Sequence, residues 1–295
     1  MPKIVLGDRE FRLSGAEKKH LTESVAGEMD GLAKAVRKAR KDTRDESCAR
    51  AEIYRKLLKP DDAEMLKLSE RRSKRMIEKF EQRTRAQKGK SRGDLRRRNF
   101  CLGHGTCFEP QPFDFAQDSF SIPFASGLSG AFAHVEQSDP RGAVGTHLLA
   151  ANLSIDMSDW AMCAFWHIPD ITGTLTMTAN ATINPSAELS PFWFDSPTAF
   201  AAFNVGVLQF TRSPFTNQGW KAISSSTLFD LGWNLFGQTT SVNTRNLSLS
   251  VSTQVDPNHF FLCAAWLSAE ITCSGRATVV VDIGASVNSF NVTVA

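Results

Sequence analysis

The sequence predicts an α+β, multi-domain chain in which an N-terminal helical hairpin or coiled-coil arm precedes an all-β sandwich or jelly-roll body with internal pseudo-duplication. Three observations lead to this prediction. The balance of charge changes sign near residue 100, the spacing of apolar residues changes there from helical to alternating, and one stretch of the second part recurs at a fixed offset. With 295 residues the chain is long enough for about two domains.

The charge is divided very unevenly along the chain. The first 100 residues contain 29 lysines and arginines and 17 aspartates and glutamates, whereas residues 101–295 contain 5 basic and 14 acidic residues. The net charge of +3 therefore hides a basic arm and a mildly acidic body. A body with so few charges has little of the charged surface that keeps a monomer in solution, so we expect copies or partners to cover part of it.

The first part of the sequence is predicted to be helical after a short hairpin. Residues 1–13 contain two short apolar segments around a Gly-Asp turn, which is typical of a β-hairpin. Residues 14–92 are predicted to form a basic helical hairpin or coiled coil with a capping box before each helix. An apolar stripe recurs at helical spacing from Leu21 to Val36, and Pro60 ends the first helix. This stripe is thin, so we expect it to pack on a neighbouring subunit or on the β body.

The rest of the chain is predicted to be β. Residues 93–115 form a linker rich in Gly, Pro and Arg, and residues 116–295 form the sandwich body, with related halves at about 126–186 and 226–286. The predicted strands lie near 116–122, 129–137, 144–155, 160–167, 171–183, 198–211, 220–236, 240–255, 259–274, 276–287 and 289–294.

The repeat that defines these halves is seventeen residues long and has no gaps. "DMSDWAMCAFWHIPDIT", Asp156 to Thr172, returns as "DPNHFFLCAAWLSAEIT", Asp256 to Thr272. The identical pairs are Asp156 and Asp256, Cys163 and Cys263, Ala164 and Ala264, Trp166 and Trp266, Ile171 and Ile271, and Thr172 and Thr272.

Two residue pairs of the repeat are predicted to belong to the core. Cys163 should be equivalent to Cys263, and Trp166 to Trp266, and both tryptophans should be largely buried. If the resemblance is a coincidence between short apolar strands, these pairs will occupy unrelated positions.

Several strands carry Ser and Thr on one face and apolar residues on the other, most clearly over residues 172–183 and again over residues 246–255. A sandwich strand with one face in water explains this alternation. The same alternation is also found in the transmembrane hairpins of pore-forming proteins, which gives a third functional alternative. We favour the sandwich because such strands are spread through the body.

A cysteine- and histidine-containing loop is the one candidate metal site. Cys101, His104 and Cys107 supply three zinc ligands within seven residues, between glycines that would let the loop wrap an ion. A closed structural zinc site needs a fourth ligand, which the sequence does not identify. The alternative, which we favour, is a tight connector whose glycines allow unusual backbone angles. Otherwise no cofactor is predicted.

A run of basic residues could contact phosphates or acidic surfaces of other subunits. Aromatic residues that would stack on single-stranded nucleic acid are nearly absent from this run, so nucleic acid is the less favoured partner. The candidate basic contacts are Arg71, Arg72, Lys74, Arg75, Arg96, Arg97 and Arg98.

The sequence contains no motif that identifies a reaction, a secretory signal or a membrane span. A nucleophile elbow, a P-loop and a His-Glu-x-x-His motif are all absent, and no catalytic residue is proposed. We expect synthesis in the cytoplasm without a signal peptide, and six cysteines that stay reduced unless they bind metal.

We therefore expect a non-enzymatic subunit that assembles with copies of itself into a filament, fibre, tail or coat-like particle, such as a virion. The arm would make intersubunit contacts and the body would form the wall or exposed tip. The layout resembles fibre and coat proteins in architecture only. The alternative is a lectin-like sandwich on a helical stalk that binds a receptor or glycan, favoured if Trp and Phe are exposed. Opposite charges of arm and body lead us to expect docking on the next copy rather than on the same chain.

Overall fold

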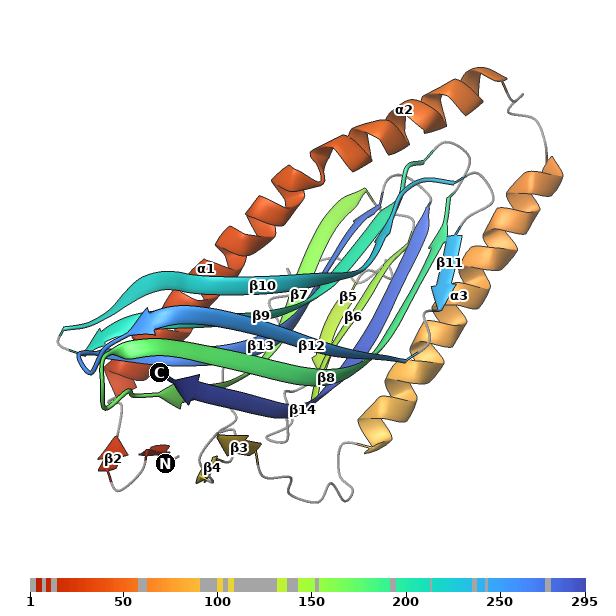
Figure 1. Cartoon of the computed structure of the whole chain (residues 1–295). Helices are drawn as coiled ribbons and strands as arrows, with labels where there is room; N and C mark the ends of the chain where they lie inside the picture. Colours follow the sequence, from red (N-terminus) through yellow and green to blue (C-terminus); the bar gives the residue numbers. More distant parts are fainter. Residues whose placement is uncertain are drawn as a thin grey trace.

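The computed structural model describes residues 4–6, 9–11, 15–57, 63–90, 100–102, 106–108, 132–136, 143–151, 154–191, 195–212, 214–234, 238–241, 244–273 and 277–295. Three helices surround a body of two antiparallel sheets with long strands (Figure 1). The predicted strand 116–122 and most of the predicted linker lie outside the described residues.

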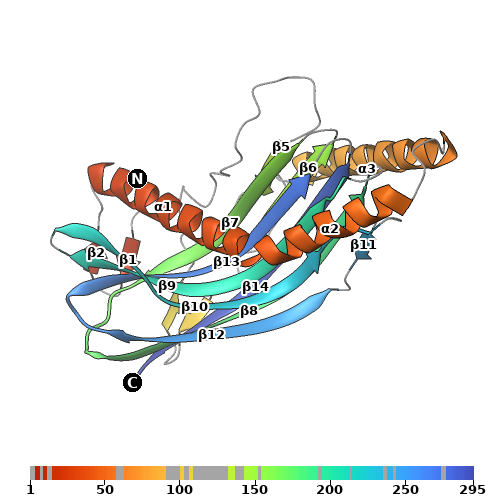
Figure 2. The ribbon, with the colours of Figure 1, turned by 90° about the horizontal axis from the view of Figure 1, so that it is seen from above.

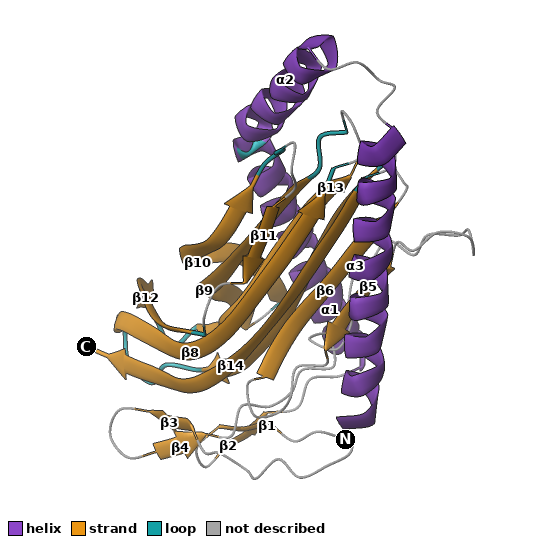
Figure 3. Cartoon of the chain, turned by 90° about the vertical axis from the view of Figure 1, so that its right-hand side faces the viewer, coloured by secondary structure: helices purple, strands orange, loops and turns teal. Residues whose placement is uncertain are grey.

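The helices are α1 (Gly15–Ala39), α2 (Lys41–Leu57) and α3 (Ala63–Lys90). A single turn residue, Arg40, separates α1 from α2, and backbone hydrogen bonds from Arg40 N to Val36 O (2.9 Å) and from Arg44 N to Arg40 O (3.1 Å) continue across it. We call α1 and α2 together the arm. The arm and α3 lie on opposite sides of the β body (Figures 1 and 3).

The helices pack on the body and not on each other. α1 contributes Leu21, Val25 and Met29 to an apolar cluster with one sheet, whereas α3 contributes Met76 to a cluster with the other sheet. Along their described lengths they therefore do not form the predicted helical hairpin or coiled coil. The stripe that begins at Leu21 was expected to pack on a neighbouring subunit or on the β body, and in the structure Leu21, Val25 and Met29 pack on an aromatic surface of the same chain's β body.

Two small hairpins precede the body. β1 (Ile4–Leu6) pairs with β2 (Arg9–Phe11), as the Gly-Asp turn predicts, and β3 (Phe100–Leu102) pairs with β4 (Thr106–Phe108). The strands of the body are β5 (Phe132–Glu136), β6 (Ala143–Ala151), β7 (Ile155–His167), β8 (Gly173–Ser190), β9 (Thr198–Arg212), β10 (Phe215–Leu231), β11 (Gln238–Ser241), β12 (Arg245–Val255), β13 (His259–Cys273) and β14 (Thr278–Val294).

These strands form a four-stranded sheet, in the order β10-β9-β13-β7, and a six-stranded sheet. The six-stranded sheet has the order β11-β8-β14-β6-β5, and β12 also pairs with β8. The strand positions predicted in the described part of the body agree in outline with the observed strands, but the divisions between strands differ in places. The predicted strand 240–255 is divided between β11 and β12. The predicted strands 276–287 and 289–294 form one strand, β14, with an irregularity between Val287 and Ser289 that shifts the alternation of its faces.

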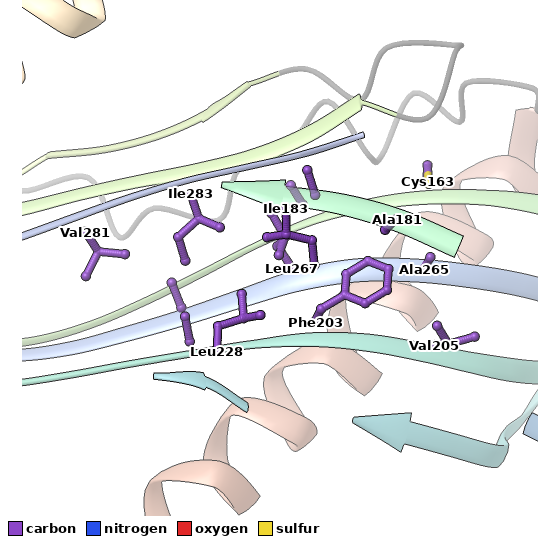
Figure 4. Close-up of a cluster of buried hydrophobic side chains, with 14 of the residues drawn as sticks. Cys163, Ala181, Ile183, Phe203, Val205, Leu228, Ala265, Leu267, Val281 and Ile283 are labelled. Carbon is purple, nitrogen blue, oxygen red and sulfur yellow. The ribbon is translucent and has the colours of Figure 1, made fainter. Parts of the chain in front are cut away.

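The main core lies between the two sheets, and the described residues that form it all come from the β body. The alternating face of β8 fills it from one side, with Leu175, Met177 and Ile183 fully buried. Phe203 of β9 and Leu267 of β13 approach from the other sheet (Figure 4). The apolar side chains of the Ser/Thr-rich strand β8 therefore point into the sandwich core.

The strand register reflects the repeat. In the four-stranded sheet Ala164 lies opposite Ala264, and in the six-stranded sheet Asn184 lies opposite Gly284. Each pair is separated by the offset of the sequence repeat, so both antiparallel pairings are centred on equivalent residues. The order of elements is repeated as well, because β6, β7 and β8 occupy the same succession of sheets as β12, β13 and β14.

Candidate arm-docking site

α1 crosses the outer face of the four-stranded sheet, on the side away from the main core (Figure 2). In a β-strand successive residues point to opposite faces, so the even-numbered residues of β7 and β13 that the core does not use meet the helix. We call this surface the aromatic patch. It consists of Trp160, Met162, Trp166, Leu208, Phe210, Phe260, Leu262 and Trp266.

The rings of the aromatic patch pack at angles typical of aromatic clusters. Trp166 meets Phe210 edge-on at 5.4 Å and Phe260 at 6.3 Å between ring centroids. Trp220 of β10 lies 4.9 Å from Trp266, and its ring covers Gly206, where an added Cβ would lie only 2.9 Å from the ring. Glycine at position 206 therefore leaves the space that the Trp220 ring occupies.

The prediction that Trp166 and Trp266 are largely buried is confirmed, since 7% and 2% of their surfaces are exposed. Their surroundings are not those of a sandwich core, because both face the arm. Cys163 and Cys263, by contrast, lie in the core between the sheets. Both tryptophans of the repeat therefore lie on the outer face of the four-stranded sheet, and both cysteines lie on its inner face.

Beyond the aromatic patch, one row of residues crosses all four strands of the sheet. Ser158 of β7 lies opposite Glu270 of β13, Glu270 opposite Phe200 of β9, and Phe200 opposite Asp230 of β10. We call these four residues the charged row. The kink between α1 and α2 lies over it.

Arg40 is the central contact of the charged row. Its Nε and Nη2 donate to Asp230 Oδ1 at 3.2 and 2.7 Å, its Nη1 lies 3.5 Å from Glu270 Oε1, and its guanidinium lies 4.8 Å from the centre of the Phe200 ring. Arg37 Nη2 donates to Ser158 Oγ at 2.8 Å.

Arg44 completes the group by lying 3.8 Å from Glu270 Oε1 and donating to the backbone oxygen of Arg37 at 2.6 Å.

The carboxyl group of Glu270 is buried among these cations. Its side chain is only 3% exposed, and neither oxygen has a hydrogen-bond partner of good geometry among the described residues. Burial raises the pKa of Glu270, and this outweighs the three nearby guanidinium groups, which lower it. The interaction is a loose buried ion pair in which electrostatic attraction offsets a large desolvation cost.

The raised pKa of Glu270 predicts a contribution to stability that declines as the pH rises. Between the pKa of an unfolded glutamate, about 4.3, and the higher pKa of folded Glu270, the folded chain holds a proton that the unfolded chain has lost. The free energy of unfolding should therefore fall as pH rises through this window. Glu270→Gln should remove this part of the slope. Urea denaturation of both proteins at a series of pH values measures it, and parallel curves would contradict the prediction.

α2 continues the docking beyond the charged row. The backbone N–H of Trp233 donates to Ser47 Oγ at 3.1 Å, and the Tyr54 ring lies 5.2 Å from the Trp233 ring. An added Cβ at Gly232 would lie 2.6 Å from Ser47 Oγ, so α2 passes very close to the backbone there. The arm therefore contacts the body along most of its length.

α3 is fixed to the six-stranded sheet by a separate set of contacts. Ser69 Oγ donates to Pro191 O at 3.0 Å, Thr278 Oγ1 donates to the buried Ser73 Oγ at 2.9 Å, and Arg72 Nε lies 3.7 Å from Glu188 Oε1.

Of the predicted basic contacts, Arg72 therefore faces its own body, whereas Arg71, Lys74 and Arg75 are exposed. Arg96, Arg97 and Arg98 lie outside the described residues. Nucleic-acid contact by the exposed basic residues stays a prediction.

The six-stranded sheet presents a second surface, which we call the hydroxyl face. Cross-strand hydrogen bonds join Thr176 to Ser252 (2.9 Å), Thr178 to Ser250 (2.7 Å) and Thr182 Oγ1 to Asn246 Oδ1 (2.9 Å). It has no charged member and consists of Thr174, Thr176, Thr178, Asn180, Thr182, Asn246, Ser248, Ser250, Ser252, Gln254, Ser286, Asn288, Asn291 and Thr293.

Two of the three predicted metal ligands are described by their backbone. Cys101 of β3 lies directly opposite Cys107 of β4, and His104 lies outside the described residues. Among the side chains that the structure describes, no group of three His, Cys, Asp or Glu residues could hold a metal ion. Zinc binding by Cys101, His104 and Cys107 stays a prediction.

Other titratable groups have structural explanations. Burial raises the pKa of the Cys163 thiol to about 12 and raises that of Cys263 further, which makes both thiols unreactive in the folded chain. His259 Nδ1 lies 2.6 Å from Asp256 Oδ2 at the β12–β13 turn. Desolvation raises the pKa of Asp256, but hydrogen bonds from Asn258 N–H and His259 lower it more.

No model of a known protein family matches this chain, and no curated protein matches it. Solved structures show low similarity. They include one described as "CBM4 structure and function" (14% identity, 53% of this chain and 79% of that chain, TM-score 0.18). Another is the enzymatically active domain of tailspike protein 4 of bacteriophage CBA120 (8% identity, 52% and 17%, TM-score 0.17). A third is a CocE/NonD family hydrolase from Staphylococcus aureus (9% identity, 63% and 40%, TM-score 0.19).

These TM-scores are too low to support any functional conclusion. Within the described residues, no helix is long and apolar enough to cross a membrane.

Sequence reasoning missed Arg40, Asp230 and Glu270, which join the arm to the body. One signal was present: Glu270 is the single acidic residue of the largely apolar strand β13. A carboxylate in such a strand requires a cationic partner if it is buried. The sequence does not indicate which of the many arginines in the arm supplies it.

Proposed function

We propose that this protein is a non-enzymatic structural subunit that assembles with copies of itself through its helical arm, while the β body forms the wall or exposed tip of the particle. One observation carries the proposal: the buried charges of the body hold the arm. Arg40 bridges Asp230 and Glu270 within an interface that also covers the aromatic patch. Such an arrangement is suited to holding two elements together.

The burial of the aromatic residues supports an assembly subunit over a lectin-like module. A receptor- or glycan-binding groove would present Trp or Phe to solvent, and neither residue type occurs among the exposed large apolar side chains of the described part of the chain. The hydroxyl face favours the lectin-like alternative, because uncharged hydroxyl and amide groups suit a neutral glycan. If the protein is strictly monomeric and binds to a glycan array, the lectin-like alternative would replace the proposed function.

The repeat supports the same architecture. We include in the proposal that the halves containing β6–β8 and β12–β14 are related by duplication, since equivalent residues lie opposite one another in both sheets. A body with internal two-fold character presents similar surfaces twice, which suits closed or repeating assembly.

Self-association can be tested with substitutions on opposite faces of α1. The full-length protein should form a defined oligomer at micromolar concentration in light scattering and negative-stain images. Val25→Asp places a charge in the fully buried contact of the arm and should abolish the defined oligomer. Ala35→Asp adds the same charge on the exposed side of the helix and should preserve the oligomer. A clean wild-type monomer at these concentrations would refute the proposed function.

A further inference from the structure

The arm and the surface beneath it have the features of an exchangeable pair. None of the described helical residues belongs to the main core between the sheets, so removal of the arm leaves the described core complete. The described contacts of α1 with the β body lie on the outer face of the four-stranded sheet, whereas α3 is anchored on the other sheet through Ser69, Ser73 and Met76. The arm can therefore change partners while α3 stays on its own body.

The match between arm and surface is both apolar and electrostatic. Leu21, Val25 and Met29 cover the aromatic patch, and three arginines of the arm lie over the acidic residues Asp230 and Glu270. Every copy of the chain carries the same arm and the same surface. The arm of a second copy therefore finds a site of the same complementarity, which is the basis of domain swapping.

A second observation points to another copy of the chain. Apolar side chains are exposed on both sides of the connection between the arm and α3: Ile53 (57%) and Leu57 (71%) on α2, and Leu68 (59%) on α3. These helix ends lie together at one end of the molecule (Figure 1). Exchange of arms between two bodies would bring two such groups together and cover them.

We infer that the arm, residues 15–57, docks on the aromatic patch and charged row of a neighbouring copy when the protein assembles. The inference rests on the proposed self-assembly and specifies its contact. Reciprocal exchange closes a two-fold dimer, and one-way exchange extends a chain of subunits. In both cases Arg40 of one copy pairs with Asp230 and Glu270 of its neighbour. Each contact within a chain is then replaced by the same contact between two chains.

Crosslinking between two variants, each with a cysteine added at a different position, tests the exchange of arms. Glu28 Oε1 accepts a hydrogen bond from Asn217 Nδ2 at 2.8 Å, so these residues mark the arm and the body of one interface. One protein carries Glu28→Cys and the other Asn217→Cys, in full-length chains whose Cys48, Cys101 and Cys107 are replaced by serine. The two are unfolded together, refolded and treated with a short bis-maleimide. Light scattering of the same sample reports assembly.

The matched control uses α3, which the inference leaves on its own body. Arg72 and Glu188 are 3.7 Å apart, so a mixture of Arg72→Cys and Glu188→Cys proteins carries an equivalent pair. We expect the first mixture to shift from the mass of one chain to that of two on a denaturing gel, and the second to remain at the mass of one chain.

Each other outcome contradicts a specific statement. A defined oligomer without crosslinks in the first mixture would overturn arm exchange and leave self-assembly intact. Crosslinks in both mixtures would overturn the independence of α3. A monomer in light scattering, with no crosslink in either mixture, would overturn the proposed function together with the exchange.

Discussion

Replacing Arg40 with methionine is expected to lower the free energy of unfolding by about 3–5 kcal/mol at neutral pH, the usual cost of removing one partner of a buried ion pair. Arg40 is 5% exposed and is the cation nearest to the buried Glu270. Methionine keeps much of the aliphatic packing and leaves the carboxylate without that cation. Because Glu270 can then take up a proton, the loss should be smaller at pH 5 than at pH 8. Urea denaturation at both pH values measures it.

A second substitution separates charge from packing. Glu270→Leu in the Arg40→Met background removes the uncompensated charge and should recover most of the lost stability, since apolar replacements of buried ion pairs are often neutral or stabilising. Arg50→Met is the control, because Arg50 pairs with Glu46 on the exposed side of α2 and its replacement should change stability by less than about 0.5 kcal/mol. If the double variant is no more stable than Arg40→Met alone, the ion pair is not the cause.

Replacing Trp266 with alanine is expected to cost about 3–5 kcal/mol, as for other buried aromatic side chains. Trp266 lies opposite Met162 and Asn204 in the four-stranded sheet, 4.9 Å from the Trp220 ring. The cavity would open beneath α1 and not between the sheets. Loss of arm contact should therefore accompany the loss of stability, seen as faster proteolysis within residues 15–39.

Ile223→Ala provides the comparison for Trp266→Ala. Ile223 lies on β10, an edge strand of the same sheet, and is 40% exposed, so its loss should cost within about 0.5 kcal/mol and leave proteolysis of α1 unchanged. A cost below about 1 kcal/mol for Trp266→Ala would mean that the tryptophan contributes little to holding the arm.

The strands were predictable because their signal is local. Alternation of polar and apolar residues in β8 and β12 identifies both the strands and their buried faces. The offset of the repeat also anticipates which residues are equivalent, and the register of Ala164 with Ala264 agrees with it.

The position of the helices was not predictable by the same means. The periodicity of α1 identifies an apolar stripe but not the surface that meets it, and β13 is apolar on both faces because one face meets the core and the other meets α1. The charged row joins residues from four strands and the arm, which no local pattern specifies. A helical hairpin was expected because the two stripes were considered in isolation.

The charged row also determines how the molecule carries a mechanical load. Ser158, Glu270, Phe200 and Asp230 run straight across β7, β13, β9 and β10, and two arginines of the arm hold this row at both ends and in the middle. Tension applied to the arm should therefore be divided among four strands instead of acting on a single edge strand. A particle in which such arms link neighbouring subunits would transmit a pull through whole sheets, with the hydrogen bonds of each sheet sharing the force.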